Sequence, residues 1–381
     1  MWLLYATCSL LCAAYCIIII AYRIWFNKLT PFQPADSNIP HCFFSIIIPA
    51  RNEEVNIINC LQSVVANNYP QAQYEIIVID DFSTDKTGEC VSMVQQQYNN
   101  IRLLALEEMI GSRSLLAYKK KAIELAIGQA KGDWIVTTDA DCIVPVNWLN
   151  NLDSYIQKTN TVFVAAPVSF INTHSFVSLF QCLDFISLQG ITAAAVSAGV
   201  HSMCNGANLA YSKATFYAVD GFKGIDTIAS GDDMLLMDKI QKQGAGSIGY
   251  LFNNNSIVQT LPMPTWKDFI NQRIRWASKA GKYKDVKIVA VLVLVYLFNA
   301  SLLVLFVGGF FAPILFLIWL ILLMVKTICE LCFMMPVARF FKQEKLLLWF
   351  PLMQPFHILY TVVAGWLGTV GKYQWKDRKV K

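Results

Sequence analysis

The sequence has little charge and few histidines. Charged residues make up only 15% of its 381 residues, whereas hydrophobic residues make up 55%, and an ordinary soluble protein is about 25% charged. This composition excludes an intrinsically disordered chain. The net charge of +5 comes without basic blocks, which argues against nucleic acid as a partner. The four histidines have no metal-ligand spacing, and no Ser-His-Asp or Cys-His triad can be proposed from them.

Two common nucleotide-binding motifs are absent. No G-x-G-x-x-G follows the first apolar strand, and no G-x-x-x-x-G-K-[ST] occurs in the chain, so dinucleotide-binding and P-loop folds are disfavoured.

The eleven cysteines do not form a disulfide framework. Cys8, Cys12 and Cys16 mark one stripe of an apolar helix, and the C-x-x-C of Cys329 and Cys332 lies inside another apolar run, which favours helix packing over zinc binding.

A long uncharged run lies at the N-terminus. Residues 2–22 carry no charge, and a bilayer core of about 30 Å requires about 20 helical residues. The first positive charges, Arg23 and Lys28, follow this run. Because basic residues favour the cytoplasmic side, residues 1–27 are predicted to be an uncleaved transmembrane anchor whose C-terminal end is cytoplasmic.

A second membrane domain is expected at residues 288–381. The uncharged run 288–311 and the apolar run 312–335 predict two transmembrane helices joined as a hairpin. The run 346–370 contains two prolines and has basic residues at both ends. These features favour a re-entrant or interfacial hairpin over a simple crossing.

Two charged residues interrupt the run 312–335. Lys326 and Glu330 are spaced i, i+4. One interpretation is a mutually neutralised pair near the cytoplasmic end, with the lysine reaching toward the interface. The other is part of a path for an acceptor or an ion.

The middle of the chain, residues 28–249, alternates between two kinds of hydrophobic pattern. Continuous runs rich in Ile and Val predict buried strands, and segments with helical spacing predict helices between them. This alternation predicts an α/β fold with a mostly parallel sheet and flanking helices. The predicted strands are 43–49, 75–80, 101–105, 134–138 and 161–166, and the predicted helices are 53–67, 84–98 and 113–130.

Acidic residues gather where these strands end, which is where ligands collect in parallel sheets. Asp80 and Asp81 follow the second strand, and Asp139 and Asp141 follow the fourth. Residues i and i+2 of an extended segment point to the same side. Two converging carboxylates repel each other unless a cation such as Mg²⁺ or Mn²⁺ lies between them. The alternative is a solvated turn or a helix cap.

A third acidic pair, Asp232 and Asp233, precedes a predicted helix at 234–240. On its own this pair fits an N-terminal helix cap. Three acidic pairs at the ends of strands or helices are harder to explain as caps alone, so the sequence favours a site made of carboxylates.

A further polar group is expected in an amphipathic interface region at residues 250–287. A helix there begins at Thr265, in a segment that resembles a capping box. At 100° per residue, Gln272, Arg275 and Trp276 form a face separate from the apolar one. Arginine suits diphosphate oxygens, and tryptophan suits the apolar face of a sugar ring. The alternative is that the basic residues of this helix only meet lipid headgroups.

Taken together, these motifs resemble family 2 glycosyltransferases, which are membrane-bound inverting enzymes with a GT-A fold. The resemblance extends to the branch that carries D, D-x-D, D and Q-x-x-R-W motifs. The matching segments occur in the family's order and cover most of residues 43–277. They are IIIPARNEE (46–54), VIDDFSTDKT (78–87), TTDADC (137–142), NGANLAY (205–211), SGDDMLL (230–236) and QRIRW (272–276).

The resemblance implies a role for each matching residue. Asp233 would be the catalytic base, Asp141 the ligand of a divalent cation, and Asp232 replaces the family's usual Glu. Lys119 or its neighbour Lys120 matches the family lysine. The expected nucleotide-sugar-binding residues are Glu53, Asp80, Asp81, Lys119, Asp139 and Arg275, and the expected acceptor-binding residues are Gln272, Trp276 and Asp232.

The resemblance also implies an activity. The first hypothesis is an inverting glycosyltransferase that moves a sugar from a nucleotide sugar, a UDP-sugar, onto a lipid-borne or glycan acceptor, with Mg²⁺ or Mn²⁺ as cofactor. The alternatives are a processive polysaccharide synthase and, in another class, a catalytically inactive membrane scaffold or lipid-binding protein. The expected location is the bacterial inner membrane, with the catalytic domain in the cytoplasm and no nucleic acid as partner.

Overall fold

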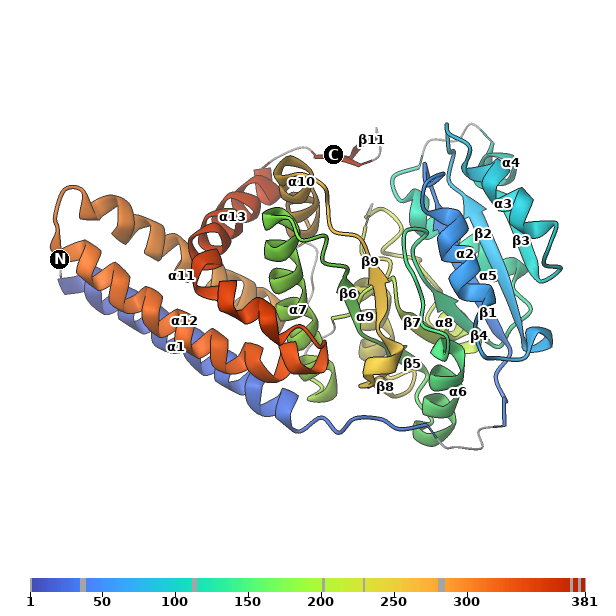
Figure 1. The fold of residues 1–381 in the computed structure, drawn as a ribbon, viewed down its shortest axis with the longest axis horizontal. Helices are drawn as coiled ribbons and strands as arrows, with labels where there is room; N and C mark the ends of the chain where they lie inside the picture. The colour runs from blue at the N-terminus through green and yellow to red at the C-terminus, as the bar shows by residue number, and fades with distance from the viewer. Residues whose placement is uncertain are drawn as a thin grey trace.

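The computed structural model describes residues 2–34, 39–111, 115–200, 203–228, 230–279, 285–370, 373–375 and 378–380. The molecule is elongated, with a bundle of apolar helices at one end and an α/β domain at the other (Figure 1). Two helices, α7 (Phe176–Ser197) and α10 (Trp266–Ala277), lie between these two parts.

A seven-stranded sheet forms the centre of the α/β domain, in the order β3-β2-β1-β4-β7-β5-β8. The first four strands along the chain run parallel, whereas β7 is antiparallel to both β4 and β5. This arrangement confirms the mostly parallel α/β fold. The strands are β1 (Phe44–Ala50), β2 (Tyr74–Asp80), β3 (Ile101–Ala105), β4 (Trp134–Thr137), β5 (Phe163–Ala165), β7 (Leu209–Ser212) and β8 (Ile248–Tyr250), and a second sheet pairs β6 (Val168–Phe170) with β9 (Val258–Thr260).

The helices predicted at 53–67, 84–98, 113–130 and 234–240 are present, whereas the sequence did not predict those at 106–110, 148–159 and 213–218. The helix predicted at 113–130 begins only at Tyr118, and Leu116, which precedes it, is 70% exposed. Arg113, the first residue of that prediction, lies outside the described residues. The helices of the α/β domain are α2 (Ile57–Val65), α3 (Thr87–Gln95), α4 (Leu106–Ile110), α5 (Tyr118–Gln129), α6 (Trp148–Thr159), α8 (Lys213–Ala218) and α9 (Met234–Lys242).

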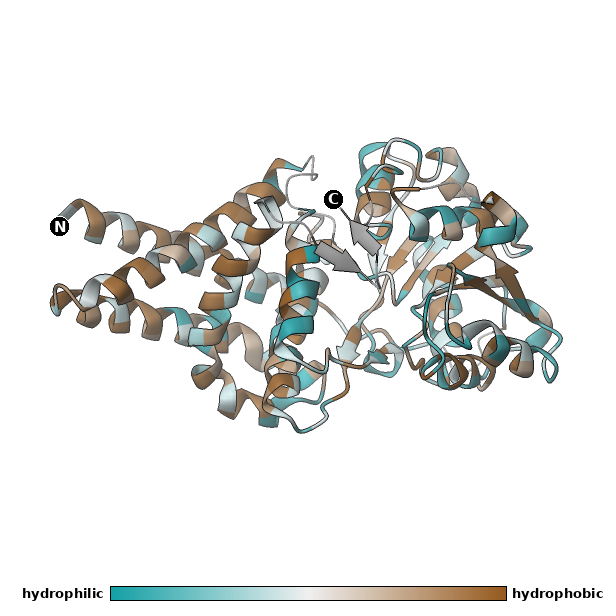
Figure 2. Ribbon diagram, turned by 90° about the horizontal axis from the view of Figure 1, so that it is seen from above, coloured by the Kyte–Doolittle hydropathy of each residue, from teal (hydrophilic) through white to brown (hydrophobic). Residues whose placement is uncertain are grey.

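Four of the apolar helices form the other end of the molecule, where most of the ribbon has the brown colour of hydrophobic residues (Figure 2). They are α1 (Trp2–Asn27), α11 (Val286–Gly309), α12 (Ile314–Phe340) and α13 (Phe350–Val370). Each is long and apolar enough to cross a membrane. The hairpin expected at 346–370 is wrong in form, because α13 is one continuous helix with Pro355 inside it and follows a short 3₁₀ turn at Glu344–Trp349.

The sequence reading missed α7. By length and composition this helix could also cross a membrane, yet 78% of its most apolar 18-residue stretch is buried inside the protein. It packs against α1, α12, α13 and β6. Because α7 is apolar on nearly all sides, it lacks the one-sided periodicity that marks a surface helix.

The charged pair on α12 is closed into a hydrogen-bonded network. Lys326 Nζ lies 2.8 Å from Glu330 Oε1 and 2.6 Å from Gln354 Oε1, and Gln354 Nε2 donates to Glu330 Oε2 at 2.5 Å. Tyr15 of α1 also donates to Glu330. The network joins α1, α12 and α13, and it agrees with a neutralised pair. The lysine does not reach toward the interface, because Lys326 is fully buried, and Glu330 lines the cavity described below.

Candidate active site

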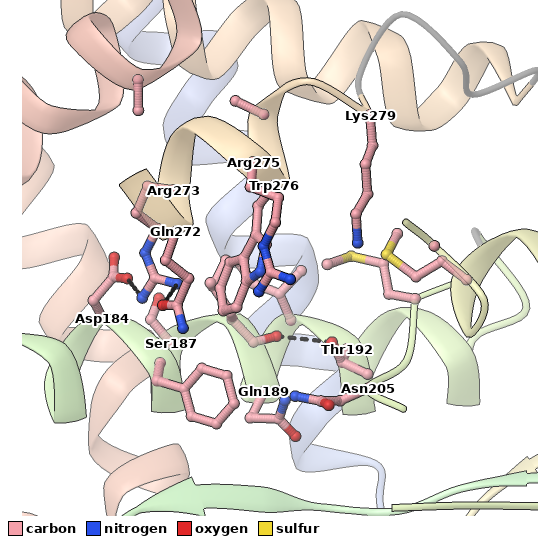
Figure 3. A pocket seen from close by; sticks show the side chains of 18 of the residues that line it. Asp184, Ser187, Gln189, Thr192, Asn205, Gln272, Arg273, Arg275, Trp276 and Lys279 are labelled. Carbon is pink, nitrogen blue, oxygen red and sulfur yellow. Dashed lines mark hydrogen bonds and ion pairs between the residues drawn. The ribbon is translucent and has the colours of Figure 1, made fainter. Parts of the chain in front are cut away.

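One cavity of about 980 Å³ connects the carboxyl ends of the strands with the apolar helices. Its lining includes Asp139, Asp141 and Asp233 on the α/β side, and Tyr22 and Tyr296 on the side of the apolar helices. Figure 3 shows α10 and α7 facing each other across part of it. The cavity therefore extends from the acidic side chains to the apolar helices.

A lysine lies among the carboxylates at the sheet end of the cavity. Lys119 Nζ is 2.8 Å from Asp139 Oδ1 and 3.4 Å from Asp232 Oδ2. Burial lowers the pKa of Lys119, but the two carboxylates outweigh burial and hold it above its usual value. Burial likewise acts to raise the pKa of Asp232, but Lys119, Lys120 and Lys279 hold it below its usual value. Lys119 and Asp232 are therefore both charged at neutral pH.

The neighbouring lysine has a different environment. Lys120 is 1% exposed, and its Nζ donates to the carbonyl oxygens of Ile228 and Ser230 at 2.5 and 2.7 Å. Burial lowers its pKa to about 8. Successive residues of a helix are about 100° apart, so Lys119 faces the cavity while Lys120 anchors the segment before Asp232.

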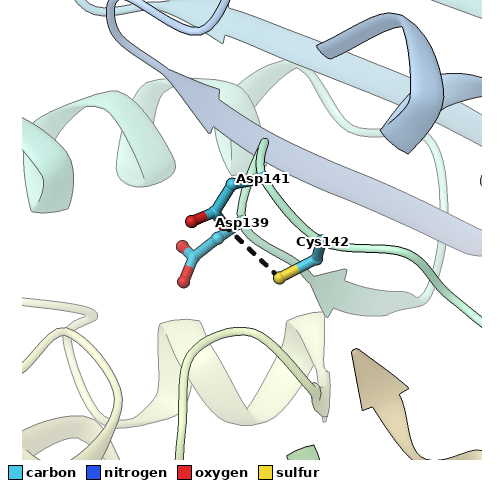
Figure 4. A group of neighbouring side chains, drawn as sticks. All are labelled: Asp139, Asp141 and Cys142. Carbon is cyan, nitrogen blue, oxygen red and sulfur yellow. Dashed lines mark hydrogen bonds between the residues drawn. The ribbon is translucent and has the colours of Figure 1, made fainter. Parts of the chain in front are cut away.

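Asp139 and Asp141 lie together after β4 and could hold a metal ion (Figure 4). Their carboxylates and the Cys142 thiol lie within 4.8 Å of one another. Burial, with the two neighbouring carboxylates, raises the pKa of the Cys142 thiol well above its usual value. The thiol therefore stays protonated and is a poor ligand, which leaves two carboxylates suited to a hard cation such as Mg²⁺ or Mn²⁺.

Asp233 is held by backbone N–H groups at the start of α9. Its Oδ1 accepts from Met234 N at 2.7 Å, and its Oδ2 accepts from Gly206 N at 3.1 Å. Gly206 lies beside the charged cluster, because a Cβ there would lie 3.4 Å from Asp232 Oδ2 and 3.6 Å from Lys119 Nζ, at ordinary van der Waals distance. Each carboxylate oxygen has two lone pairs, so Asp233 keeps accepting capacity toward the cavity.

The second polar group lies on α10, as its spacing predicts. Thr265 caps this helix, since its Oγ1 accepts from Asp268 N at 3.2 Å. Gln272, Arg275 and Trp276 line the cavity (Figure 3). The sequence motifs at strand ends and on α10 therefore meet in one place, although they are more than 130 residues apart.

Not every expected residue lines the cavity. Glu53 and Asp81 do, whereas Asp80 lies outside the lining and accepts a hydrogen bond from Ser83 N at 3.0 Å. The sequence reading missed Arg273 and Asp184, which also line the cavity. Asp184 is the only charged residue in the apolar stretch 176–197, and such isolation is a usable signal because buried charges need partners.

Two family descriptions match the chain. "Glycosyl transferase family 2" matches residues 45–181, and "Glycosyl transferase family group 2" matches residues 134–341, which is more than half of the chain. The fold, the acidic site and these matches define a glycosyltransferase. The chain belongs to glycosyl transferase family group 2.

Several curated proteins are similar over part of their length. Glycosyltransferase AglE of Haloferax volcanii is 34% identical over 147 residues, which are 39% of this chain and 46% of AglE. A second relative, from Methanococcus voltae, is 33% identical over 116 residues, which are 30% of this chain and 34% of that protein. Its name is dolichyl N-acetyl-alpha-D-glucosaminyl phosphate 3-beta-D-2,3-diacetamido-2,3-dideoxy-beta-D-glucuronosyltransferase. The beta-monoglucosyldiacylglycerol synthase of a Nostoc species is 29% identical over 116 residues, 30% of this chain and 24% of that enzyme. The chain thus matches less than half the length of each.

A solved structure shares the fold. The mannosyltransferase PcManGT from Pyrobaculum calidifontis, solved with GDP-Man and Mn²⁺, has a TM-score of 0.60 and 17% identity. The alignment covers 93% of this chain and 99% of that chain. The likeness confirms a GT-A-like architecture together with the apolar helices.

Proposed function

We propose that this protein is a membrane-bound inverting glycosyltransferase that moves a sugar from a nucleotide sugar, a UDP-sugar, onto a lipid-borne acceptor. The observation that carries the proposal is the continuous cavity, which reaches from Asp139 and Asp233 to Tyr22 and Tyr296 on the apolar helices. A nucleotide sugar can enter from the water side, and a lipid can enter from the membrane side. The basic flanks of the apolar runs favour a cytoplasmic α/β domain, and we propose the bacterial inner membrane as the location.

The charges in the cavity suit the departure of a nucleoside diphosphate. Arg275 and Lys119 carry positive charge near the place where negative charge grows on the leaving group. Asp139 and Asp141 would hold the divalent cation, which supplies further positive charge beside the diphosphate when bound. Glu53 and Asp81, also in the lining, would contact the nucleoside, and Asp80 would support them from outside the cavity.

Asp233 is the proposed base. It accepts the proton of the acceptor hydroxyl while that oxygen attacks the anomeric carbon from the face opposite the diphosphate. The bond between the anomeric carbon and the diphosphate oxygen breaks as the new glycosidic bond forms. One such displacement inverts the anomeric configuration, and no covalent intermediate with the protein is required.

The names of two relatives support a lipid acceptor. One refers to a dolichyl phosphate derivative and the other to a diacylglycerol. These names describe those proteins, and both similarities lie within about a third of this chain. They agree with the apolar helices that line one end of the cavity. Gln272 and Trp276 on α10, together with Asp232 at the sheet end, would contact the polar part of the acceptor.

Product analysis tests this proposal. Membranes that contain the protein are incubated with a panel of nucleotide sugars and a total lipid extract, and the products are analysed by mass spectrometry. We expect one sugar added to a lipid, with inverted anomeric configuration by NMR. A ladder of polymer masses would instead indicate a processive synthase, and the absence of any transfer would favour an inactive scaffold.

A further inference from the structure

Arg273, the second residue of the segment QRIRW on α10, makes a buried ion pair with Asp184 of α7. Arg273 Nη2 lies 2.5 Å from Asp184 Oδ2, and the two side chains are only 4% and 3% exposed. The pair lies directly beside the cavity, which both residues help to line. Replacing a buried ion pair with apolar residues of similar size is often neutral or even stabilising, so stability alone is a weak reason for these charges.

The guanidinium of Arg273 also contacts both proposed acceptor-binding side chains of its own helix. Its Cζ lies 4.1 Å from the centroid of the Trp276 ring, and its Nη1 donates to Gln272 Oε1 at 3.3 Å. The same Cζ lies 4.8 Å from the centroid of the Phe269 ring. Figure 3 shows Gln272, Arg273 and Trp276 projecting from α10 toward α7, with Asp184 facing the arginine. One planar cation is therefore in contact with an amide and an indole that face the cavity.

A third helix holds the carboxylate in place. Tyr360 of α13 donates its hydroxyl proton to Asp184 Oδ1, and His357 Nε2 lies 3.9 Å from the same oxygen. Asp184 thus has one oxygen facing α13 and the other facing Arg273. The orientation of the guanidinium is fixed by two helices, α7 and α13, that pack in or against the apolar bundle.

We infer that Arg273 is a positioning residue for acceptor binding. The ion pair with Asp184 fixes its guanidinium, and the guanidinium in turn sets the orientation of the Trp276 ring and the Gln272 amide, so that both face the acceptor. A lysine could keep the charge and the pairing with Asp184, but it lacks the flat face that stacks on indole and the second group of N–H donors that reaches Gln272. This inference rests on the proposed function, because it needs an acceptor in this part of the cavity.

The test measures donor and acceptor separately in the full-length protein. For Arg273→Lys, we expect the half-saturating amount of a total lipid extract in phosphatidylcholine vesicles to rise about three- to thirty-fold, because the variant loses the hydrogen bond to Gln272 and the flat stacking contact with Trp276. The Kd for UDP and the melting temperature should stay near wild type. Arg102→Lys is the matched control, because Arg102 faces Glu75 at 3.9 Å and lies outside the cavity lining, and it should change none of these values.

A second variant keeps the inference testable if Arg273→Lys does not fold. Tyr360→Phe removes the hydroxyl that donates to Asp184 and keeps the ring, and it should raise the half-saturating lipid amount by a smaller factor. Unchanged lipid saturation in the folded variants, or an equal weakening of UDP binding, overturns the inference. Failure of the wild-type protein to glycosylate any lipid overturns the proposed function instead, so the two failures are distinguishable.

Discussion

The charged residues at the sheet end and those among the apolar helices are held in different ways. Lys119 and Asp139 pair at 2.8 Å with side chains that are 25% and 37% exposed. Lys326 and Glu330 pair at the same distance but are 0% and 10% exposed. A partly exposed pair can exchange its partner for a ligand at little cost, whereas a buried pair that loses one member leaves an isolated charge. The first arrangement suits a reaction site, and the second suits a fixed scaffold.

Metal removal should have the largest effect on the sheet end. If Asp139 and Asp141 hold a divalent cation, EDTA should abolish transfer, and Mg²⁺ or Mn²⁺ should restore it, because the leaving diphosphate loses its main counter-charge. Asp141→Asn should lose turnover and still fold. Asp238→Asn is the control, since Asp238 pairs with Lys242 on the surface of α9. Full transfer in EDTA would contradict the assignment.

Asp233→Asn should have the second largest effect on transfer. General-base assistance is typically worth about 10²- to 10⁴-fold, so turnover should fall by that factor while donor binding stays close to wild type. If Asp233 were only the cap of α9, asparagine, which is itself a good cap, would keep the hydrogen bond from Met234 N and lose only the one from Gly206 N, and turnover would change little. A variant that keeps more than about a tenth of wild-type turnover, a loss too small for a base, would move the role to Asp232 or remove it.

Among the apolar helices, Glu330→Gln should lower the free energy of unfolding. It leaves the Lys326 ammonium buried without its counter-charge, and breaking a buried pair typically costs about 3–5 kcal/mol. Unfolding of the detergent-solubilised protein measures this change. Glu124→Gln, which breaks an exposed pair with Lys121, should cost less than about 1 kcal/mol. Equal effects of the two substitutions would remove the distinction between the two regions.

The smallest effect is expected at Thr265, where α10 begins. Thr265→Ala removes the oxygen that accepts from Asp268 N, and losing an N-cap typically costs about 1 kcal/mol. Thr265→Ser keeps the oxygen and should restore most of the melting temperature. A melting temperature for Thr265→Ala equal to wild type would show that α10 is held by its packing alone.

The sequence predicted the parts of the site whose signal is local. Strand runs such as 75–80 locate the carboxylates at the sheet edge, and helical spacing places Gln272, Arg275 and Trp276 on one face. It left open which of Lys119 and Lys120 faces the site, because that depends on where α5 begins.

The long-range contacts could not be predicted in this way. Arg273 and Asp184 lie 89 residues apart, and nothing in the local pattern links them. α7 was missed because tertiary packing buries it on most sides. Its isolated aspartate was the one available signal, and it indicates only that a partner exists.

The most direct test of the account asks whether the membrane side of the cavity holds the acceptor. Thr361 of α13 lines the cavity, whereas Leu359 on the same helix is 52% exposed and lies outside the lining. We expect Thr361→Trp to abolish transfer to lipid, because the indole fills the acceptor's path, and to leave the Kd for UDP unchanged. Leu359→Trp should retain both. Wild-type transfer to lipid by a folded Thr361→Trp variant would contradict the proposal that the acceptor reaches Asp233 from the apolar helices.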